Sequence, residues 1–259
     1  MERKRRVLDD HRDARTAARA PIKVLPQYWS DESSRRRYLD RLFDDTAGDY
    51  DFVERLLGLG TGPWYRRSAL ARAGLKPGMH VLDVATGTGL VAREALTTIG
   101  PTGRLVGLDP SQGMLERAGS LGVPLVRALG ERLPFTDGSF DFVSMGFALR
   151  HVADLDLLFA EMRRVLRPGG SACILECTRP KNALHAGALR VFMTRVVPAV
   201  AAPWRRRTQA RELMQLFWDT IEACVPPEAV LESLGRAGLG EPRRNVALGM
   251  FSEYTAIRN

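Results

Sequence analysis

The sequence predicts an α/β protein built on a doubly wound, mostly parallel sheet. Strand-like and helix-like segments alternate from residue 75 to residue 177, an order that is typical of such sheets. A loop with two glycines, "ATGTGL", directly follows the first strand-like run, "HVLDV". The chain has 259 residues, of which 45% are hydrophobic, enough for one well-packed domain or a domain with a small cap.

The central elements follow from local patterns in chain order. Leu155, Leu158, Phe159 and Met162 recur at helical spacing, and Pro168, Gly169 and Gly170 stop that helix. Ser111 is a candidate N-cap for the second helix. The expected order is turn, strand and loop over 75–89, helix 90–100, strand 103–110, helix 111–120, strands 124–129 and 140–149, helix 154–167 and strand 171–176.

The flanking segments are expected to extend this core. Residues 1–45 are predicted to be a charged extension with helical potential and little core, and 46–259 a single domain. Within that domain, 46–74 is expected to form a helical cap and 178–225 a helical insertion. The tail "RRNVALGMFSEYTAIRN" has two short strand-like runs around Gly249, which predicts a closing hairpin antiparallel to the other strands.

Composition excludes several classes of protein. The net charge is +8, but no nucleic-acid recognition motif accompanies it, so a solvated surface, an acidic ligand or a membrane surface accounts for it better. The longest apolar stretch is interrupted by Arg190 and Arg195, which argues against a membrane-spanning helix. Three cysteines at irregular spacing indicate neither a disulfide set nor a zinc site, so no metal is expected. Free thiols fit a cytoplasmic location.

The glycine loop suits two classes of ligand. "GTGLVA" satisfies the weak dinucleotide pattern G-x-G-x-x-A, and Asp109, at the end of the next strand, could accept hydrogen bonds from ribose hydroxyls in either class. Asp83 separates the two, because an acid beside the loop would repel a pyrophosphate. S-adenosylmethionine (SAM) has no phosphate and carries an ammonium and a sulfonium. The loop is therefore expected to bind SAM, and an NAD(P) oxidoreductase is disfavoured.

Four segments resemble one family. "VLDVATGTG", "GLDPSQGML", "ERLPFTDGSFDFVSMGFALRHVADLD" and "EMRRVLRPGG" have the order and spacing of class I SAM-dependent methyltransferases. They are most similar to the ubiquinone/menaquinone-biosynthesis C-methyltransferases, mainly over residues 40–177. The resemblance implies a sheet of seven strands that ends in an antiparallel strand.

The resemblance also implies the cofactor contacts. Gly87, Thr88 and Gly89 would line the methionine part of SAM, with Asp83 and Ala85 beside them, and Gly146 would lie opposite the sulfur. Asp109 would bind the ribose, and Tyr50 would close over the cofactor from the cap. The remaining contacts would surround the adenine: Pro110, Met114, Leu129 and Gly130.

The sequence departs from that family at three places. Leu129 stands where the family usually has Asp or Asn, so adenine N6 would need a backbone carbonyl or water. His151 replaces the usual Asn, because "GLRN" reads "ALRH" here. The C-terminal ending "MFSEYTAIRN" also differs. The last two departures leave the identity of the acceptor open, though not that of the methyl donor.

Methyl transfer to a ring carbon of a quinol or phenol needs a base that deprotonates the ring hydroxyl or a cation that stabilises the phenolate. Arg150 and His151 are expected at the pocket lip in these roles, with His151 titrating near neutrality. Alternative roles are a salt bridge from Arg150 to Asp154 and a packing role for His151. Transfer to oxygen or nitrogen of a secondary metabolite is the alternative reaction, and a protein that binds SAM without turnover is a further alternative.

The insertion is expected to cover the acceptor. Phe147 from the core and Phe192, Met193 and Trp204 from the insertion could wall a pocket for a small aromatic acceptor, prenylated, polyketide-like or otherwise lipid-like. The insertion's arginines could meet phospholipid headgroups, which would place the protein at the membrane periphery. A homodimer is also left open.

Overall fold

The computed structural model describes residues 20–22, 24–47, 50–57, 60–200 and 204–259. Its centre is a seven-stranded sheet in the order β3-β2-β1-β4-β5-β7-β6. The order reverses beside β1, so the end of that strand lies at the switch point where ligands bind in open α/β sheets. The strands are β1 (His80–Val84), β2 (Arg104–Asp109), β3 (Leu125–Arg127), β4 (Phe140–Gly146), β5 (Leu166–Cys177), β6 (Gly240–Ala247) and β7 (Phe251–Ile257).

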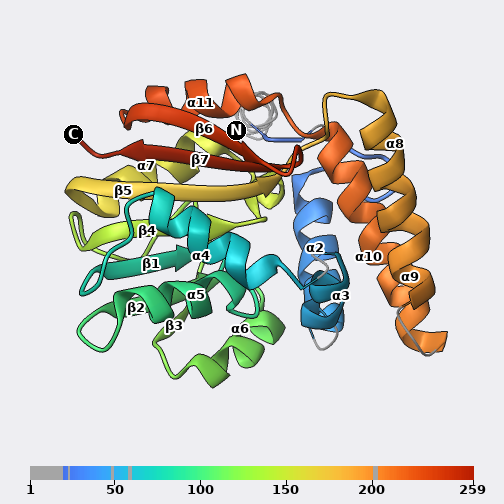
Figure 1. The fold of residues 1–259 in the computed structure, drawn as a ribbon, viewed down its shortest axis with the longest axis horizontal. Helices are drawn as coiled ribbons and strands as arrows, with labels where there is room; N and C mark the ends of the chain where they lie inside the picture. Colours follow the sequence, from blue (N-terminus) through green and yellow to red (C-terminus); the bar gives the residue numbers. More distant parts are fainter. Residues whose placement is uncertain (1–19, 23, 48–49, 58–59, 201–203) are drawn as a thin grey trace, which may run out of the picture.

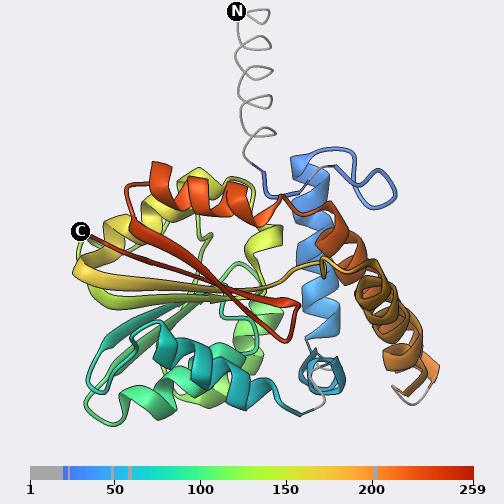
Figure 2. The same ribbon diagram turned by 45° about the horizontal axis from the view of Figure 1, so that its top comes forward.

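Helices cover both faces of the sheet, as the alternating sequence pattern predicts. Figure 2 shows α4 (Gly62–Arg72) and α5 (Leu90–Ile99) on one face, and α7 (Leu155–Val165) and α11 (Pro227–Arg236) on the other. The short α6 (Gln112–Ala118) packs beside β2 and β3. Two buried apolar clusters, one on each face, form the core. The doubly wound fold class is confirmed.

Several sequence-based boundaries change. The helix predicted over 154–167 ends at Val165, and Leu166 already belongs to β5. Helix α11 was not predicted. The tail forms the expected hairpin, but only β7 runs antiparallel to β5, and β6 is antiparallel to β7. Strand β6 therefore runs in the same direction as the parallel strands, which corrects the expectation for the whole hairpin. Ser111 is confirmed as an N-cap, because its Oγ accepts from the Met114 N–H at 3.1 Å.

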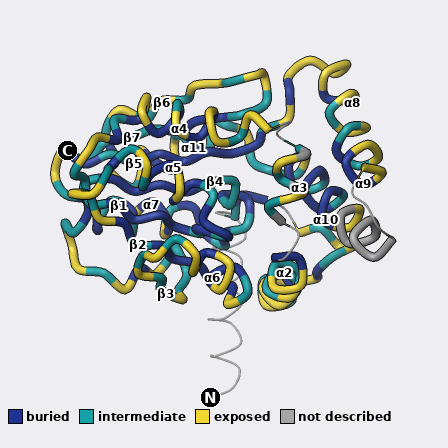
Figure 3. The backbone as a smooth tube through the Cα atoms, turned by 60° about the horizontal axis from the view of Figure 1, so that its bottom comes forward, coloured by how far each residue is buried: buried dark blue, intermediate teal, exposed yellow. Residues whose placement is uncertain are grey.

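A second group of helices stands at the end of the sheet where the parallel strands finish (Figure 1). It contains α2 (Glu32–Thr46) and α3 (Tyr50–Leu57) from the N-terminal part. The insertion contributes α8 (Ala183–Val191), a π-helical turn over Phe192–Val196, α9 (Val197–Val200) and α10 (Trp204–Ala223). The inner face of the insertion packs into an apolar cluster that includes Met193, whereas the outer face of α8 is exposed (Figure 3).

The N-terminal part contributes more to the fold than its charge suggests. Ile22, Trp29 and Leu39 are buried together with Leu216 of α10. The expectation of little core before residue 45 is therefore wrong from residue 20 onward, while residues 1–19 lie outside the described part. Helix α2 begins at a capping box, in which Asp31 accepts from the Ser34 N–H and the Ser34 side chain bonds the Asp31 N–H.

Candidate functional site

The glycine loop shapes a cavity at the switch point, called here the first cavity. Its volume, open mouth included, is about 1200 Å³. Gly87 has a φ of +57°, and a Cβ added there would meet nothing within 4 Å, so the backbone itself borders open space. The lining includes these predicted residues: Ala85, Gly87, Thr88, Asp109, Pro110, Met114, Leu129, Gly130, Gly146, Phe147 and His151.

Asp109 ties the loop to the second strand. Its Oδ2 accepts from the Gly87 N–H at 2.8 Å, and its Oδ1 accepts from the Ser111 N–H at 2.9 Å. Burial raises the pKa of Asp109 to about 6, and the two backbone hydrogen bonds oppose this rise. The carboxylate is thus a buried acceptor that faces the cavity from the end of β2.

Two predicted cofactor residues support the loop from behind. Asp83 does not line the first cavity, because it is buried below the loop and accepts from Ser144 Oγ at 2.6 Å and Thr86 Oγ1 at 2.7 Å. Burial raises the pKa of Asp83 to about 6. Gly89, with a φ of +88°, begins α5 and lies against Leu121. Neither Asp83 nor Gly89 is among the residues that line the first cavity, so the structure gives each a position behind the loop. The Tyr50 side chain lies outside the described part.

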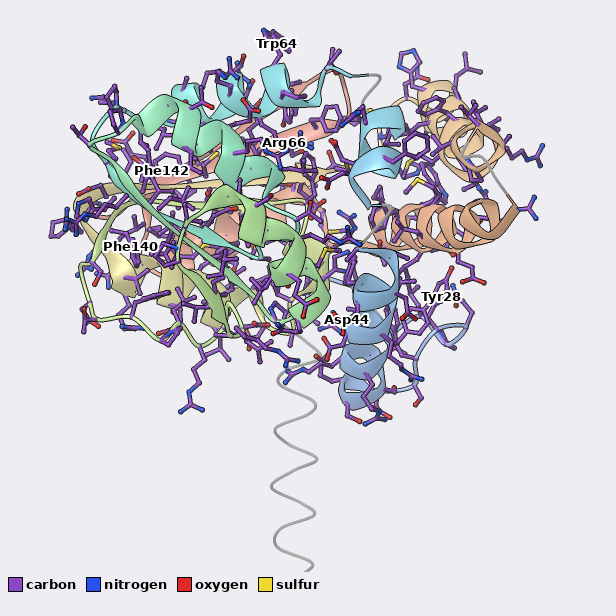
Figure 4. All side chains as sticks on the ribbon, turned by 90° about the horizontal axis from the view of Figure 1, so that it is seen from below. Tyr28, Asp44, Trp64, Arg66, Phe140 and Phe142 are labelled. Carbon is purple, nitrogen blue, oxygen red and sulfur yellow. The ribbon has the colours of Figure 1, made fainter. Side chains whose placement is uncertain are left out.

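Helix α2 closes the first cavity, a role that sequence reasoning missed. Arg35, Leu39 and Phe43 lie four residues apart, so they share one face of the helix, and all three line the cavity. Asp44, labelled in Figure 4, accepts from Ser111 Oγ at 2.6 Å and from the Gly113 N–H at 3.0 Å, which fastens α2 to α6. The four-residue spacing of Arg35, Leu39 and Phe43 was the signal in the sequence that could have revealed this role.

His151 lines the first cavity as a buried imidazole. Neither ring nitrogen has a hydrogen-bond partner among the described residues, although both are buried. Phe43 packs edge-on against the ring at 5.3 Å between centroids, and Arg35 donates to the His151 carbonyl at 3.2 Å. Burial, together with Arg150 and Arg35, lowers the pKa of His151 well below 6.5. The expectation that His151 titrates near neutrality is therefore wrong.

Arg150 faces a different cavity from the one expected. Its side chain is buried, forms an ion pair with Glu176 and donates to Thr220 Oγ1 at 3.1 Å. The alternative partner, Asp154, instead caps α7 by accepting from the Asp156 N–H at 2.9 Å. Arg150 borders the cavity next to the first one, and its charge is balanced by a buried carboxylate. The expectation that Arg150 lies at the lip of the cofactor pocket is therefore wrong.

The adjoining cavity, called here the second cavity, lies under the insertion. Its volume, open mouth included, is about 680 Å³. Glu54, Arg66 and Phe147 line both cavities and separate them. The rest of the lining is mainly apolar and aromatic: Leu57, Tyr65, Cys177, Met193, Leu213, Met214, Phe217, Ile221 and Phe251.

The structure describes the side chains of three of the four predicted acceptor residues. Phe147 and Met193 line the second cavity, and their contact with an acceptor stays a prediction. Phe192 instead borders the outer apolar groove of α8. The Trp204 side chain lies outside the described part. No group of three or more potential metal ligands occurs among the residues described.

Comparison with known proteins gives a consistent result. The model of the ubiE/COQ5 methyltransferase family matches residues 31–236. A ubiquinone/menaquinone biosynthesis C-methyltransferase of Hahella chejuensis is 33% identical over 235 residues, which cover 87% of this chain and 93% of that protein. A demethylmenaquinone methyltransferase of Mycobacterium tuberculosis is 37% identical over 84% of this chain and 91% of that protein.

Solved structures share the fold. A SAM-dependent methyltransferase from Thermotoga maritima superposes with a TM-score of 0.61 at 18% identity, over 85% of this chain and 99% of the other. A phosphoethanolamine N-methyltransferase of Haemonchus contortus, solved with SAM, has a TM-score of 0.61 at 16% identity, over 86% of this chain and 60% of the other. At these identities the likeness concerns the fold alone.

Proposed function

The chain belongs to the ubiE/COQ5 methyltransferase family, and we propose that it transfers the methyl group of SAM to a ring carbon of a hydroquinone or phenol. The observation that carries this proposal is the pair of adjoining cavities with one shared wall at Glu54, Arg66 and Phe147. The first cavity has the glycine loop and a buried acid. The second is apolar and suits an aromatic ring with a lipid-like tail.

The first cavity fits the cofactor. The open space beside Gly87 admits a ligand against the backbone, and Asp109 offers a carboxylate for ribose hydroxyls. Pro110, Met114, Leu129 and Gly130 would surround the adenine. When bound there, SAM supplies an electrophilic methyl on a sulfonium. Asp83 and Gly89 would hold the loop in shape rather than touch the ligand.

Methylation of a ring carbon requires a base. The ring carbon bonds the methyl group as the carbon–sulfur bond breaks and the sulfur keeps the electron pair. A ring hydroxyl must lose its proton to make that carbon nucleophilic. Once the methyl group is attached, the carbon's own proton leaves to solvent and the base returns the first proton to the ring oxygen, which restores the aromatic hydroxyl. His151, neutral and without a partner among the described residues, lines the first cavity, and its ring lies 6.5 Å between centroids from Phe217 of the second cavity. It is proposed to take the proton of a ring hydroxyl that reaches past the shared wall into the first cavity. Phe147, in the shared wall, would position the ring.

The reaction is tested with the purified full chain, SAM and a chemically reduced naphthohydroquinone. We expect a product heavier by one methylene that keeps both exchangeable phenolic protons and lacks one ring proton by NMR. A product that has lost a phenolic proton would instead show transfer to oxygen. Binding of S-adenosylhomocysteine with no methylated product from reduced quinones or phenols would contradict the proposal.

Asp109 should control cofactor affinity. We expect Asp109→Ala to weaken SAM binding by roughly 1.5–3 kcal/mol, the range for hydrogen bonds to a charged group. Because the pKa of Asp109 is raised to about 6, the carboxylate is lost as the pH falls, and affinity should drop about tenfold from pH 7 to pH 5. Calorimetry with S-adenosylhomocysteine measures both effects, with Asp109→Asn as the control that removes the titration. Unchanged affinity in Asp109→Ala would refute this placement.

Two predicted partners stay predictions: a membrane surface and a second copy of the chain. The cytoplasm likewise stays the predicted location. No helix among the described residues is long and apolar enough to cross a bilayer. The outer face of the insertion supports a peripheral contact best, because Leu184 is 81% exposed and Val191 47% exposed beside the cationic Arg190.

A further inference from the structure

The second cavity contains two polar groups that the reaction described above does not use. Tyr65 and Arg66 are consecutive residues of α4, both are buried, and both line the cavity. The Tyr65 hydroxyl and the Arg66 Nε have no hydrogen-bond partner among the described residues. A buried polar group without a partner destabilises the fold, so two of them on residues that line one cavity indicate a polar ligand group there.

Both side chains are held in place by their surroundings. The Tyr65 ring stacks on Phe251 at 4.7 Å between centroids. The Arg66 guanidinium forms an ion pair with Glu54 and lies 5.8 Å from the centroid of the Phe147 ring. A Cβ added at Gly62 would lie 2.7 Å from Arg66 Nη1, so that glycine leaves room for the pair. Figure 4 shows Arg66 at the end of the sheet that faces the helical group.

The chemistry of the two groups favours an oxygen. Arginine Nε can only donate, and a tyrosine hydroxyl can donate as well as accept. Burial raises the pKa of Tyr65, so the hydroxyl keeps its proton and remains a donor at working pH. Two donors in an apolar cavity match a ring oxygen, including one that gains negative charge. Glu54 balances Arg66, so the empty cavity carries no uncompensated cation.

We propose that Tyr65 and Arg66 anchor a ring oxygen of the acceptor in the second cavity. This inference rests on the proposed function, because it assigns the second cavity to the aromatic acceptor. It also moves the role of oxygen-binding cation from Arg150 to Arg66 in the wall between the cavities, because Arg150 Nε donates to Thr220 Oγ1 whereas Arg66 Nε has no partner among the described residues. The two residues thereby select an oxygen-bearing ring over a plain hydrocarbon of the same shape.

The test compares two probes that differ by a single oxygen, α-naphthol and naphthalene, bound to the full chain saturated with S-adenosylhomocysteine. We expect Tyr65→Phe to weaken α-naphthol binding about fivefold to tenfold and to leave naphthalene binding unchanged. Arg66→Lys keeps a charge for Glu54 but lacks Nε, so it should weaken α-naphthol in the same selective way. With a naphthohydroquinone as substrate, KM should rise more than kcat falls.

Tyr254→Phe is the matched control, because Tyr254 is a buried tyrosine of β7 that lines neither cavity. Far-UV circular dichroism and a cooperative thermal unfolding transition verify that each variant is folded. Equal losses for both probes, or no loss for either, would overturn the anchor. Selective loss for α-naphthol in a chain that methylates no hydroquinone would support the anchor and refute the proposed reaction, so the two failures are distinguishable.

Discussion

Replacing His151 with alanine should lower turnover about 100-fold or more, within the range that general base catalysis contributes, and leave affinity for S-adenosylhomocysteine nearly unchanged. The imidazole is neutral and its nitrogens have no partner among the described residues, so it can accept a proton from a ring hydroxyl. The measurement is kcat with saturating SAM and a naphthohydroquinone. The matched control is His185→Ala, because His185 is an exposed histidine on α8.

The pH profile separates a base from a packing residue. Because the pKa of His151 lies well below 6.5, its basic form persists below neutrality, and kcat should stay level from pH 8 to pH 6.5. Any fall caused by its protonation appears below that range and is absent from His151→Ala. His151→Asn keeps a polar side chain but cannot act as a base, so it should be about as slow as the alanine variant. Near-normal turnover in both variants would leave positioning alone as the source of catalysis.

The same pKa shift has a consequence for stability. The folded protein keeps His151 neutral, whereas the unfolded chain takes up a proton near pH 6.5. The unfolded state therefore binds more protons below that pH, and the free energy of unfolding contributed by this group falls as the pH drops below 6.5. Burial of His151 is thus expected to lower the stability of the fold at acidic pH, whatever its part in the reaction.

Sequence patterns predicted the parts of the site that local chemistry determines. The glycine loop and Asp109 lie where a strand ends, and the parallel arrangement brings those ends together, with Gly87 N and Asp109 Oδ2 2.8 Å apart. The helix N-cap at Ser111 is likewise determined by a few neighbouring residues. Residues whose role depends on one short segment can be found without coordinates.

Partners distant in the sequence could not be predicted in this way. Arg35 reaches the backbone carbonyls of His151 and Val152, more than 100 residues along the chain, and its charge helps to keep that imidazole neutral. Tyr65 stacks on Phe251 of the last strand. No periodicity reveals such pairs, because they are created by the packing of α2 and α4 on the assembled sheet. The contribution of α4 to the second cavity therefore appeared only in the structure.

The second large effect is expected at Arg150. Arg150→Ala should lower the free energy of unfolding by about 3–5 kcal/mol, because it leaves the carboxylate of Glu176, 1% exposed, without its cation. Burial already raises the pKa of Glu176, and the Arg150 charge opposes that rise. Without Arg150 the pKa rises further, so the carboxyl becomes neutral at higher pH and the loss shrinks as the pH falls. Urea denaturation at several pH values measures this trend.

A double variant then separates stability from catalysis. Glu176→Gln keeps an acceptor for the Cys177 N–H, which bonds Glu176 Oε1 at 2.7 Å, and removes the charge that Arg150 balances. Combined with Arg150→Met, it should recover most of the stability, because a buried ion pair adds little over a neutral pair of similar volume. If the double variant is as unstable as Arg150→Ala, the ion pair is not what Arg150 contributes. If the double variant is stable and catalytically active, Arg150 stabilises the structure around the second cavity and takes no part in methyl transfer. If the double variant is stable but inactive, Arg150 is needed for methyl transfer itself.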